Sequence, residues 1–571
     1  MVNWTAVIVI FTRILCVCYS LKTEPEVKVQ QGVLRGNVAR SVNGFKYFIF
    51  KGIPYAKPPV GVLKFMPPQP PDSWNGTKFA QEDGNICVQR APMADYLTGD
   101  EDCLYLNIYT PKLPSKNNDK KYPVMVWIHG GSFNTGSGTS SEYTPEFLVA
   151  ENVLVVTINY RLGLWGFLNA PAIGIPGNAG LKDQLQALSW IQQNIAKFSG
   201  DHQQVTLFGW SAGAAAIHLH MLFPEPVSKG LFHRVILQSG TAINPWTMNV
   251  HPELWSNCLL KNLGLSNNRS STLRDLQNTP RYKLFKRQHC PELDEKYSYG
   301  IYPFAYLPSP ERISRTNKKP THFNLVVFGL MSLQKQIPMM IGYTSKEGNL
   351  YQMPEGDDLL EVTDKTELKN NIKLECLAYY MESSNYNYTD IVEKIYNRYY
   401  GKETDPKKLF EISINLTTDC SMLFGIENTV RFYTKYRKNH GSIKGNIYYY
   451  RFSFDGSFGM AKNEYGLTHI EGASHGDDLG YLFHWKNPPQ DLHSNSTLRE
   501  RKLMRTMIKM WTNFAKTGNP TPEVNRDVPI KWLPATEQKI YMLDINNELK
   551  MLRNVNNDIH NFYANFSLNR L

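Results

Sequence analysis

The stretch Thr206–Ala216, TLFGWSAGAAA, constrains the fold more than any other part of the chain. A β-prone apolar run ends at Gly209, Ser211 follows a bulky tryptophan, and small residues suited to a helix come next. In such a G-x-S-x-G pattern the turn from strand to helix is so tight that side chains at the two glycine positions would clash. The serine hydroxyl is then held above the sheet at the N-terminus of the helix, where negative charge is favoured. The stretch therefore predicts a strand, a sharp turn carrying Ser211 and a helix.

Apolar runs alternate with helical patterns through most of the chain. Residues 27–50 alternate apolar and polar side chains between glycines, which is typical of short antiparallel strands. Further strands are expected at 122–131, 152–161, 205–210, 234–240, 337–343 and 446–454, and helices at 180–198 and 498–517. This alternation predicts an α/β fold with a large, mostly parallel central sheet flanked by helices and a small N-terminal antiparallel portion. Because no Pro-, Gly- or Ser-rich linker interrupts the sequence, residues 21–571 are expected to form a single domain.

The N-terminus carries an apolar run from Ala6 to Cys18, and small and polar residues follow from Ser20. A run of this length is too short to span a bilayer and is typical of a secretory signal peptide. Arg13 interrupts it, so an uncleaved signal anchor is the alternative interpretation. We expect residues 1–20 to be a signal peptide and the remaining chain to be secreted, with no stable membrane anchor.

The charge pattern argues against nucleic-acid binding. The 571 residues carry a formal net charge of +11, but Lys and Arg are scattered along the sequence. Nucleic-acid binding requires them to cluster on one element. We therefore expect a basic solvated surface and no nucleic-acid partner, and the oligomeric state is left open.

Cysteines and glycosylation sequons fit a secreted protein. Cys87 and Cys103 are close in sequence with a polar loop between them, so they are expected to form a disulfide. The pairing of the other cysteines beyond the signal peptide is left open: Cys258, Cys290, Cys376 and Cys420. N-glycosylation is expected at the sequons of Asn75, Asn268, Asn387, Asn415, Asn495 and Asn565.

A serine hydroxyl needs a base to become a nucleophile, and the base needs an acid that orients it. In a strand–turn–helix context the expected order along the chain is serine, acid, histidine. Glu347 follows an apolar strand, and His475 lies in a loop before an aromatic run, so both fit the order after Ser211. Asp477 and Asp478 are rival acids, but a carboxylate so close in sequence rarely reaches the histidine Nδ1, and we expect these two to cap the loop.

Acyl transfer also needs backbone N–H donors for the oxyanion of the transition state. The sequence WIHGGSF ends a strand with the consecutive amides of Gly130, Gly131 and Ser132, and the amide of Ala212 directly follows the serine. We expect these four residues to form the oxyanion hole. No H-E-x-x-H pattern or paired C-x-x-C is present, so neither a metal nor a cofactor is expected.

From Val27 to Leu543 the sequence resembles the type-B carboxylesterases of the cholinesterase-like family, and it is most similar to secreted insect carboxylesterases. The blocks that carry the resemblance are FKGIPYAKPPVGVLKF, EDCLYLNIYTP, NYRLGLWGF, GNAGLKDQLQAL, FSGDHQQVTLFGWSAG, ILQSG and WTNFAKTGNPTP. The resemblance implies an α/β-hydrolase fold and the disulfide Cys87–Cys103. It also implies a serine carboxylesterase in which Ser211 is the nucleophile, Glu347 the acid and His475 the base.

The resemblance further implies that Gly131, Ser132 and Ala212 are the oxyanion donors. It implies that Ser239 is a buried serine supporting the site and that Trp246 lines the acyl pocket. Its functional implication is the hydrolysis of a small-molecule carboxylic ester through an acyl-enzyme. A slow or silent relative that binds or sequesters hydrophobic esters is the alternative.

Several positions depart from the family pattern. Trp210 stands where a glutamate usually precedes the serine, which favours apolar substrates over cationic ones: xenobiotic, lipid-like or pheromone-like esters. Ser132 replaces the usual third glycine, and Ser199 a Gly or Arg. The loop before Cys103 lacks the choline-binding tryptophan of cholinesterases, and juvenile-hormone esterases usually carry Gln at the position of Trp210, so neither identity is favoured. The segment Phe323–Gln336 is either a divergent loop or intron-coded sequence retained in the chain.

Overall fold

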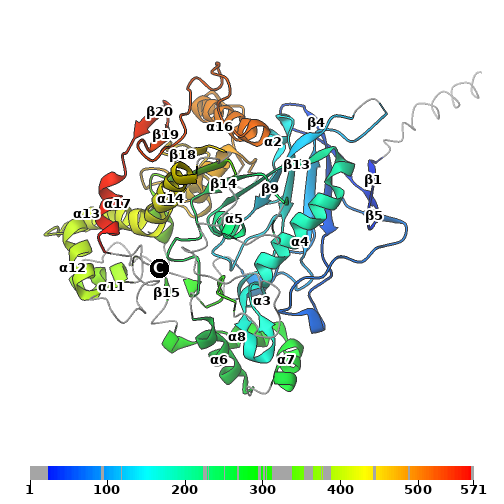
Figure 1. The fold of residues 1–571 in the computed structure, drawn as a ribbon, viewed down its shortest axis with the longest axis horizontal. Helices are drawn as coiled ribbons and strands as arrows, with labels where there is room; N and C mark the ends of the chain where they lie inside the picture. Colours follow the sequence, from blue (N-terminus) through cyan, green and yellow to red (C-terminus); the bar gives the residue numbers. More distant parts are fainter. Residues whose placement is uncertain are drawn as a thin grey trace, which may run out of the picture.

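The computed structural model describes most of the chain (Figure 1). The described residues are 24–91, 96–116, 119–222, 228, 230–249, 251–265, 269–293, 298–299, 302–303, 305–311, 337–352, 364–373, 376, 388–440, 445–485 and 489–566. The expected signal peptide and the segment Phe323–Gln336 lie outside them.

In the described part of the chain, one eleven-stranded sheet forms the centre of the molecule, in the order β20-β19-β18-β17-β14-β13-β9-β10-β8-β4-β3. Its parallel strands are β10 (Leu154–Ile158), β9 (Tyr122–Ile128), β13 (Gly200–Trp210), β14 (Arg234–Gln238), β17 (Met339–Thr344), β18 (Ile447–Phe452) and β19 (Tyr541–Ile545). Antiparallel strands close both edges: β20 (Lys550–Arg553) on one side, and β8 (Tyr105–Thr110), β4 (Lys46–Pro54) and β3 (Asn37–Arg40) on the other. The α/β-hydrolase fold with a mostly parallel sheet is confirmed.

The N-terminal antiparallel portion is divided between two sheets. β1 (Glu26–Val29) and β2 (Gly32–Arg35) pair as an antiparallel hairpin, and β5 (Thr77–Phe79) joins β2 in parallel to complete a small sheet. The next hairpin, β3 and β4, instead extends the central sheet. Two-stranded pairs complete the described strands: β6 (Gln89–Arg90) with β7 (Leu97–Thr98), β11 (Asn169–Ala170) with β12 (Ile175–Pro176), and β15 (Ser298–Tyr299) with β16 (Tyr302–Pro303).

Helices of the described chain cover both faces of the central sheet and also extend beyond it (Figure 1). They are α2 (Glu146–Ala150), α3 (Gly163–Phe167), α4 (Ala179–Asn194), α5 (Ala212–Leu222), α6 (Pro252–Leu263), α7 (Arg269–Asn278), α8 (Arg281–Arg287), α11 (Lys365–Ile372), α12 (Tyr388–Tyr399), α13 (Pro406–Thr417), α14 (Phe424–His440), α15 (Met460–Glu464), α16 (Leu498–Thr517) and α17 (Asn557–Ala564). In Figure 1, α6, α7 and α8 lie at one end of the molecule and α11 and α12 at another. As expected, α16 ends where Gly518 adopts the left-handed conformation.

The side chains of β9 alternate between the two helix layers that cover the sheet. Val124, Val126 and Ile128 belong to the hydrophobic cluster that contains the apolar side chains of α4 and α5. Met125 and Trp127 belong to the other cluster, which contains those of α16. Because successive side chains of a strand point to opposite faces, α4 and α5 cover one face of the sheet and α16 covers the other. The loops at the carboxyl ends of the parallel strands then form a common edge between these layers.

Within the described residues, no helix is long and apolar enough to cross a membrane. The same residues contain no group of three or more His, Cys, Asp or Glu side chains that could hold a metal ion.

Candidate active site

Ser211 lies at the sharp turn between β13 and α5. Its φ angle is 56°, in the left-handed region that non-glycine residues seldom adopt. The Ser211 amide donates to the Gln238 carbonyl oxygen at the end of β14 (2.8 Å), and its own carbonyl oxygen accepts from the Ala215 amide (2.9 Å). The strained backbone is therefore held from both sides, as the sequence pattern predicts for a nucleophile above a sheet.

The glycines around Ser211 are required by close backbone contacts. A Cβ atom on Gly209 would lie 2.7 Å from the Ile128 carbonyl oxygen at the end of β9, and one on Gly213 would collide with the same oxygen. A Cβ on Gly240 would collide with the carbonyl oxygen of Ser211 itself. The first two contacts explain the G-x-S-x-G pattern, whereas the role of Gly240 in supporting the turn emerges only from the structure.

Glu347 and His475 meet across two neighbouring loops. Glu347 begins the short helix η5 (Glu347–Gln352) after β17, and the Nδ1 atom of His475 is 2.5 Å from its Oε2 atom. Both side chains are buried. The Glu347 Oε1 atom accepts from the Thr344 amide (2.7 Å), and the Lys346 amide donates to the Ala473 carbonyl oxygen (2.9 Å), so the two loops are joined beside this contact. The carboxylate thus fixes the orientation of the imidazole and favours a proton on Nδ1.

The loop that carries His475 packs against the residue before the serine. The rings of Trp210 and His475 lie with centroids 4.8 Å apart. Gly476 has a φ of 91°, and a Cβ there would lie 2.8 Å from the indole ring of Trp210. Trp210 is therefore a wall of the site next to the histidine, where the sequence placed apolar bulk instead of a carboxylate.

Asp477 and Asp478 hold the histidine loop. Asp477 accepts from the Ser474 amide (2.7 Å) and the Lys462 amide (3.1 Å). Asp478 accepts from the Gln238 side-chain amide (2.8 Å) and the Tyr450 hydroxyl (3.1 Å), which ties the loop to the end of β14. Burial raises the pKa of Asp477 to about 7 and that of Asp478 to about 6. The expected capping role of Asp477 is confirmed, and the carboxylate on the His475 Nδ1 atom is that of Glu347.

The glycine loop after β9 lies directly beside the serine. A Cβ on Gly130 would lie 3.1 Å from the Ser211 Cβ atom. Gly131 and Ser132 both have positive φ angles, 99° and 53°, and the Gly131 carbonyl oxygen accepts from the amides of Asn134 and Thr135. Those bonds turn the Gly131 carbonyl into the loop. The backbone amides of Gly131 and Ser132 donate to no described residue.

Two further residues implied by the family resemblance, Ser239 and Trp246, are buried. Ser239 has a φ of 54°, and its amide donates to the Gly342 carbonyl oxygen (2.8 Å). Its hydroxyl has no hydrogen-bond partner among the described residues. The indole N–H of Trp246 donates to the Ser421 carbonyl oxygen (3.1 Å). Their roles in catalysis and in an acyl pocket remain predictions.

A cleft adjoins the glycine loop. Its lining comes from several separate segments: Val88, Gln89, Arg90, Asn134, Thr135, Gly163, Leu164, Trp165, Phe285, Gln288, His289, Ala305 and Tyr306. Trp246 is not part of this lining. The walls are mostly apolar and aromatic, and the lining includes no carboxylate. Sequence reasoning missed these residues because no local pattern marks them.

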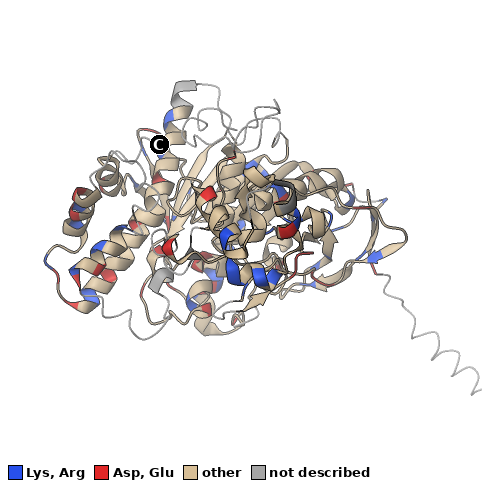
Figure 2. Ribbon diagram, turned by 90° about the horizontal axis from the view of Figure 1, so that it is seen from below, with Lys and Arg blue, Asp and Glu red and all other residues tan. Residues whose placement is uncertain are grey.

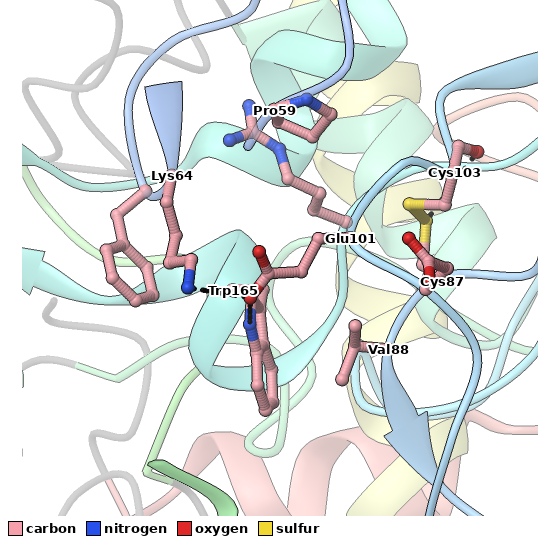
Figure 3. Close-up of a pocket in the computed structure, with 10 residues that line it drawn as sticks. Pro59, Lys64, Cys87, Val88, Glu101, Cys103 and Trp165 are labelled. Atoms are coloured by element: carbon pink, nitrogen blue, oxygen red, sulfur yellow. Dashed lines mark hydrogen bonds and ion pairs between the residues drawn. A yellow bond between two sulfur atoms is a disulfide. The ribbon is translucent and has the colours of Figure 1, made fainter. Parts of the chain in front are cut away.

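The described residues contain three disulfides: Cys87–Cys103, Cys258–Cys290 and Cys376–Cys420. Beside the first, the Glu101 carboxylate pairs with Lys64 (2.8 Å) and accepts from the indole N–H of Trp165 (3.2 Å), as Figure 3 shows. These contacts anchor the loop that supplies Gln89 and Arg90 to the cleft.

Four of the six sequon asparagines are described and are solvent-exposed: Asn75, Asn415, Asn495 and Asn565. Asn268 and Asn387 lie outside the described residues.

Comparisons with known proteins agree with this architecture. Residues 23–563 match the Carboxylesterase family. The chain is 34% identical to the juvenile hormone esterase of Tribolium castaneum, over 89% of this chain and 86% of that protein. It is 32% identical to esterase FE4 of Myzus persicae, over 91% and 88%. The crystal structure of juvenile hormone esterase from Manduca sexta, with OTFP covalently attached, superposes with a TM-score of 0.78 at 27% identity and covers 95% of this chain and 99% of that one. The chain therefore belongs to the carboxylesterase family and is a carboxylic-ester hydrolase of the α/β-hydrolase fold.

Proposed function

We propose that the protein hydrolyses esters through an acyl-enzyme on Ser211, with His475 as the base and Glu347 as the acid. The observation that carries the proposal is the buried contact of 2.5 Å between the imidazole and the Glu347 carboxylate. His475 lies in a loop that packs on Trp210, the residue directly before the serine. Three residues that are distant in sequence thus reach one edge of the sheet.

The proposed reaction has two symmetrical halves. The Nε2 atom of His475 takes the hydroxyl proton of Ser211 as the oxygen attacks the ester carbonyl, and the imidazolium then protonates the departing alcohol. Water repeats the sequence on the acyl-enzyme and releases the acid. Glu347 holds the imidazole in the required tautomer and stabilises its charged form. The amides of Gly131, Ser132 and Ala212 supply the oxyanion donors, next to Gly130, and losing one such donor typically costs about 3 kcal/mol in the barrier.

We expect the substrates to be uncharged, apolar esters, of the xenobiotic, lipid-like or pheromone-like kind. Trp210 contributes an indole beside the histidine, and the adjoining cleft has Leu164, Trp165 and Phe285 in its walls. Transfer of an apolar group into such a cleft is favoured by about 25 cal/mol for each Å² removed from water. Similarity to juvenile hormone esterases and to an insect esterase supports an ester of this class.

Ser211→Ala tests the proposed nucleophile. The variant should lose p-nitrophenyl acetate hydrolysis while its thermal unfolding curve stays close to that of the wild type, because the alanine retains the same buried volume except for one oxygen. Pre-steady-state measurements on the wild type should show turnover; a burst followed by slow release would indicate the sequestering alternative. Activity retained in Ser211→Ala would exclude this serine as the nucleophile.

We also propose that the protein is secreted as one catalytic domain after removal of residues 1–20. The three disulfides and the exposed sequon asparagines support an oxidising, extracellular environment. Expression in eukaryotic cells, followed by N-terminal sequencing and glycosidase treatment of the medium, tests this. Cell-associated protein that keeps its N-terminus would contradict it.

A further inference from the structure

A basic surface lies next to the cleft, on α8. Between Leu276 and Pro291 the sequence contains no Asp or Glu, but it contains four cationic residues: Arg281, Lys283, Lys286 and Arg287. The helix buries Leu284 and Phe285 and exposes its remaining side chains. Residues four apart lie on one helix face, so Tyr282 with Lys286 and Lys283 with Arg287 form two adjacent exposed rows.

Exposed apolar side chains accompany these cations. Tyr282 is 63% exposed, Tyr96 63% and Val62 79%. The Arg281 guanidinium donates to the Gly99 carbonyl oxygen (2.8 Å) and pairs with the Asp100 carboxylate (3.3 Å), which joins α8 to the hairpin of β6 and β7 beside Tyr96. Tyr282 and Tyr96 thus lie on segments that this contact holds together, and a gathering of exposed apolar groups marks an interaction surface.

A second contact brings Val62 to the same side. The Gln277 side-chain amide, at the end of α7, donates to the Val62 carbonyl oxygen (2.8 Å) in the short helix η1 (Gly61–Leu63). Gln277 precedes α8 by only four residues. Because the Arg281 charge is paired with Asp100, we call the set Val62, Tyr96, Tyr282, Lys283, Lys286 and Arg287 the basic rim.

The basic rim borders the cleft. Phe285, Gln288 and His289, at the end of α8, line the cleft, and Arg90 from the hairpin of Tyr96 lines it as well. Figure 1 places α6, α7 and α8 together at one end of the molecule, and Figure 2, which looks at that end, shows Lys and Arg positions near its centre with Asp and Glu positions among them. A substrate that enters the cleft from this side passes the rim.

We propose that the basic rim binds the surface of anionic lipid assemblies and so delivers lipid-dissolved esters to the cleft. Lysine and arginine near an anionic lipid surface gain Coulomb energy, and exposed aromatic and aliphatic side chains insert at the headgroup level. A soluble polyanion would use the same cations but would gain nothing from Val62, Tyr96 and Tyr282. The interleaving of apolar and cationic side chains therefore favours lipid over a polyanion.

Co-sedimentation with vesicles of phosphatidylcholine, with and without phosphatidylglycerol, tests the charge of the rim. The wild type should bind the anionic vesicles, and added salt should weaken that binding. The triple variant Lys283→Gln, Lys286→Gln, Arg287→Gln should lower the partition coefficient about a hundredfold, at about fivefold for each charge. As a matched control, Arg526→Gln, Lys531→Gln, Lys539→Gln removes the same charge from exposed positions between α16 and β19 and should bind as the wild type does.

The apolar side chains distinguish lipid from a polyanion. Val62→Ser with Tyr282→Ser should weaken vesicle binding about tenfold and leave retention on immobilised heparin unchanged. Equal binding of the two triple variants, wild-type binding that ignores phosphatidylglycerol, or retention on heparin without vesicle binding would overturn the proposal. All variants should hydrolyse p-nitrophenyl acetate in free solution at the wild-type rate. Because vesicle binding is measured without turnover, its outcome is separate from that of the Ser211 proposal.

Discussion

The turn that carries Ser211 and the rim of the cleft are built in different ways. At the turn, backbone groups of β9, β13 and β14 contact one another directly, and Gly209, Gly213 and Gly240 are needed to let them approach. At the rim, segments far apart in sequence are joined by single side chains on backbone carbonyls, such as Arg281 on Gly99. The position of Ser211 is thus fixed by the backbone, whereas the cleft proposed to take the substrate depends on side chains that can change one at a time.

The largest effect on activity is expected from Glu347→Gln. The amide keeps the shape of the side chain but disturbs the tautomer of His475, and in a comparable triad such a change lowers kcat about 10⁴-fold. The loss should appear in kcat with every ester tested, because the acid acts through the histidine and not on the substrate. Stopped-flow or steady-state kinetics measure it, and a loss confined to KM would contradict the assigned role.

Gly240→Ala is expected to damage the turn from outside the G-x-S-x-G motif. Its Cβ would collide with the Ser211 carbonyl oxygen, so the serine must shift. A displacement of about 1 Å costs on the order of a hundredfold in rate, and the strain should lower the unfolding free energy by about 1–3 kcal/mol. Gly264→Ala is a control for the rate: the left-handed φ of 70° strains an alanine at this helix end, but its Cβ meets no neighbour, so stability should fall and kcat should not. Equal kcat values in the two variants would show that the backbone at Gly240 does not position the serine.

Phe285→Ala should affect binding instead of chemistry. The side chain lines the cleft away from the serine turn, so its removal is expected to raise KM about tenfold for bulky apolar esters. The kcat with p-nitrophenyl acetate should stay at the wild-type value. A rate profile across esters of increasing size tests this separation. A uniform fall in kcat for all esters would show that Phe285 affects the chemistry at the serine turn and not only binding in the cleft.

The smallest effect concerns pH and the loop of His475. Burial raises the pKa of Asp478 to about 6 from a model-compound value of 3.8, so between these pH values the folded state binds more protons than the unfolded state. The associated stability is fully present below about pH 4 and is lost as the pH rises through about 6.

Asp478→Asn should remove this dependence, because the amide oxygen still accepts from Gln238 and Tyr450. The Tm of the wild type minus that of the variant should fall by about 1–3 °C from pH 4 to pH 7. Scanning calorimetry across this range measures it, and a constant difference would mean that the carboxyl is ionised throughout.

Local patterns were sufficient to predict much of the fold. The buried strands and the helix that ends at Gly518 follow from periodicity and from glycine and proline signals, which act within a few residues. The order of Ser211, Glu347 and His475 followed from the placement of each after a predicted strand. The pairing of β2 with β5 could not be predicted in this way, because it joins segments more than forty residues apart.

Other features depend on contacts that no local pattern records. Gly240 matters because of where the Ser211 carbonyl points, and Asp478 because Gln238 and Tyr450 converge on it. The cleft residues come from several separate segments, so each one alone reads as an ordinary loop or helix residue. Trp246 was expected in a pocket from resemblance alone, and its observed hydrogen bond to Ser421 neither requires nor removes that role.

The most direct test of the central claim is peptide mass spectrometry after inactivation with p-nitrophenyl diethyl phosphate. The hydroxyl activated by His475 should displace p-nitrophenol, leaving one diethylphosphoryl group on Ser211 in step with the loss of esterase activity. His475→Ala should largely prevent the labelling. A stoichiometric label on another residue, or an unlabelled Ser211 in fully inactivated protein, would contradict the account.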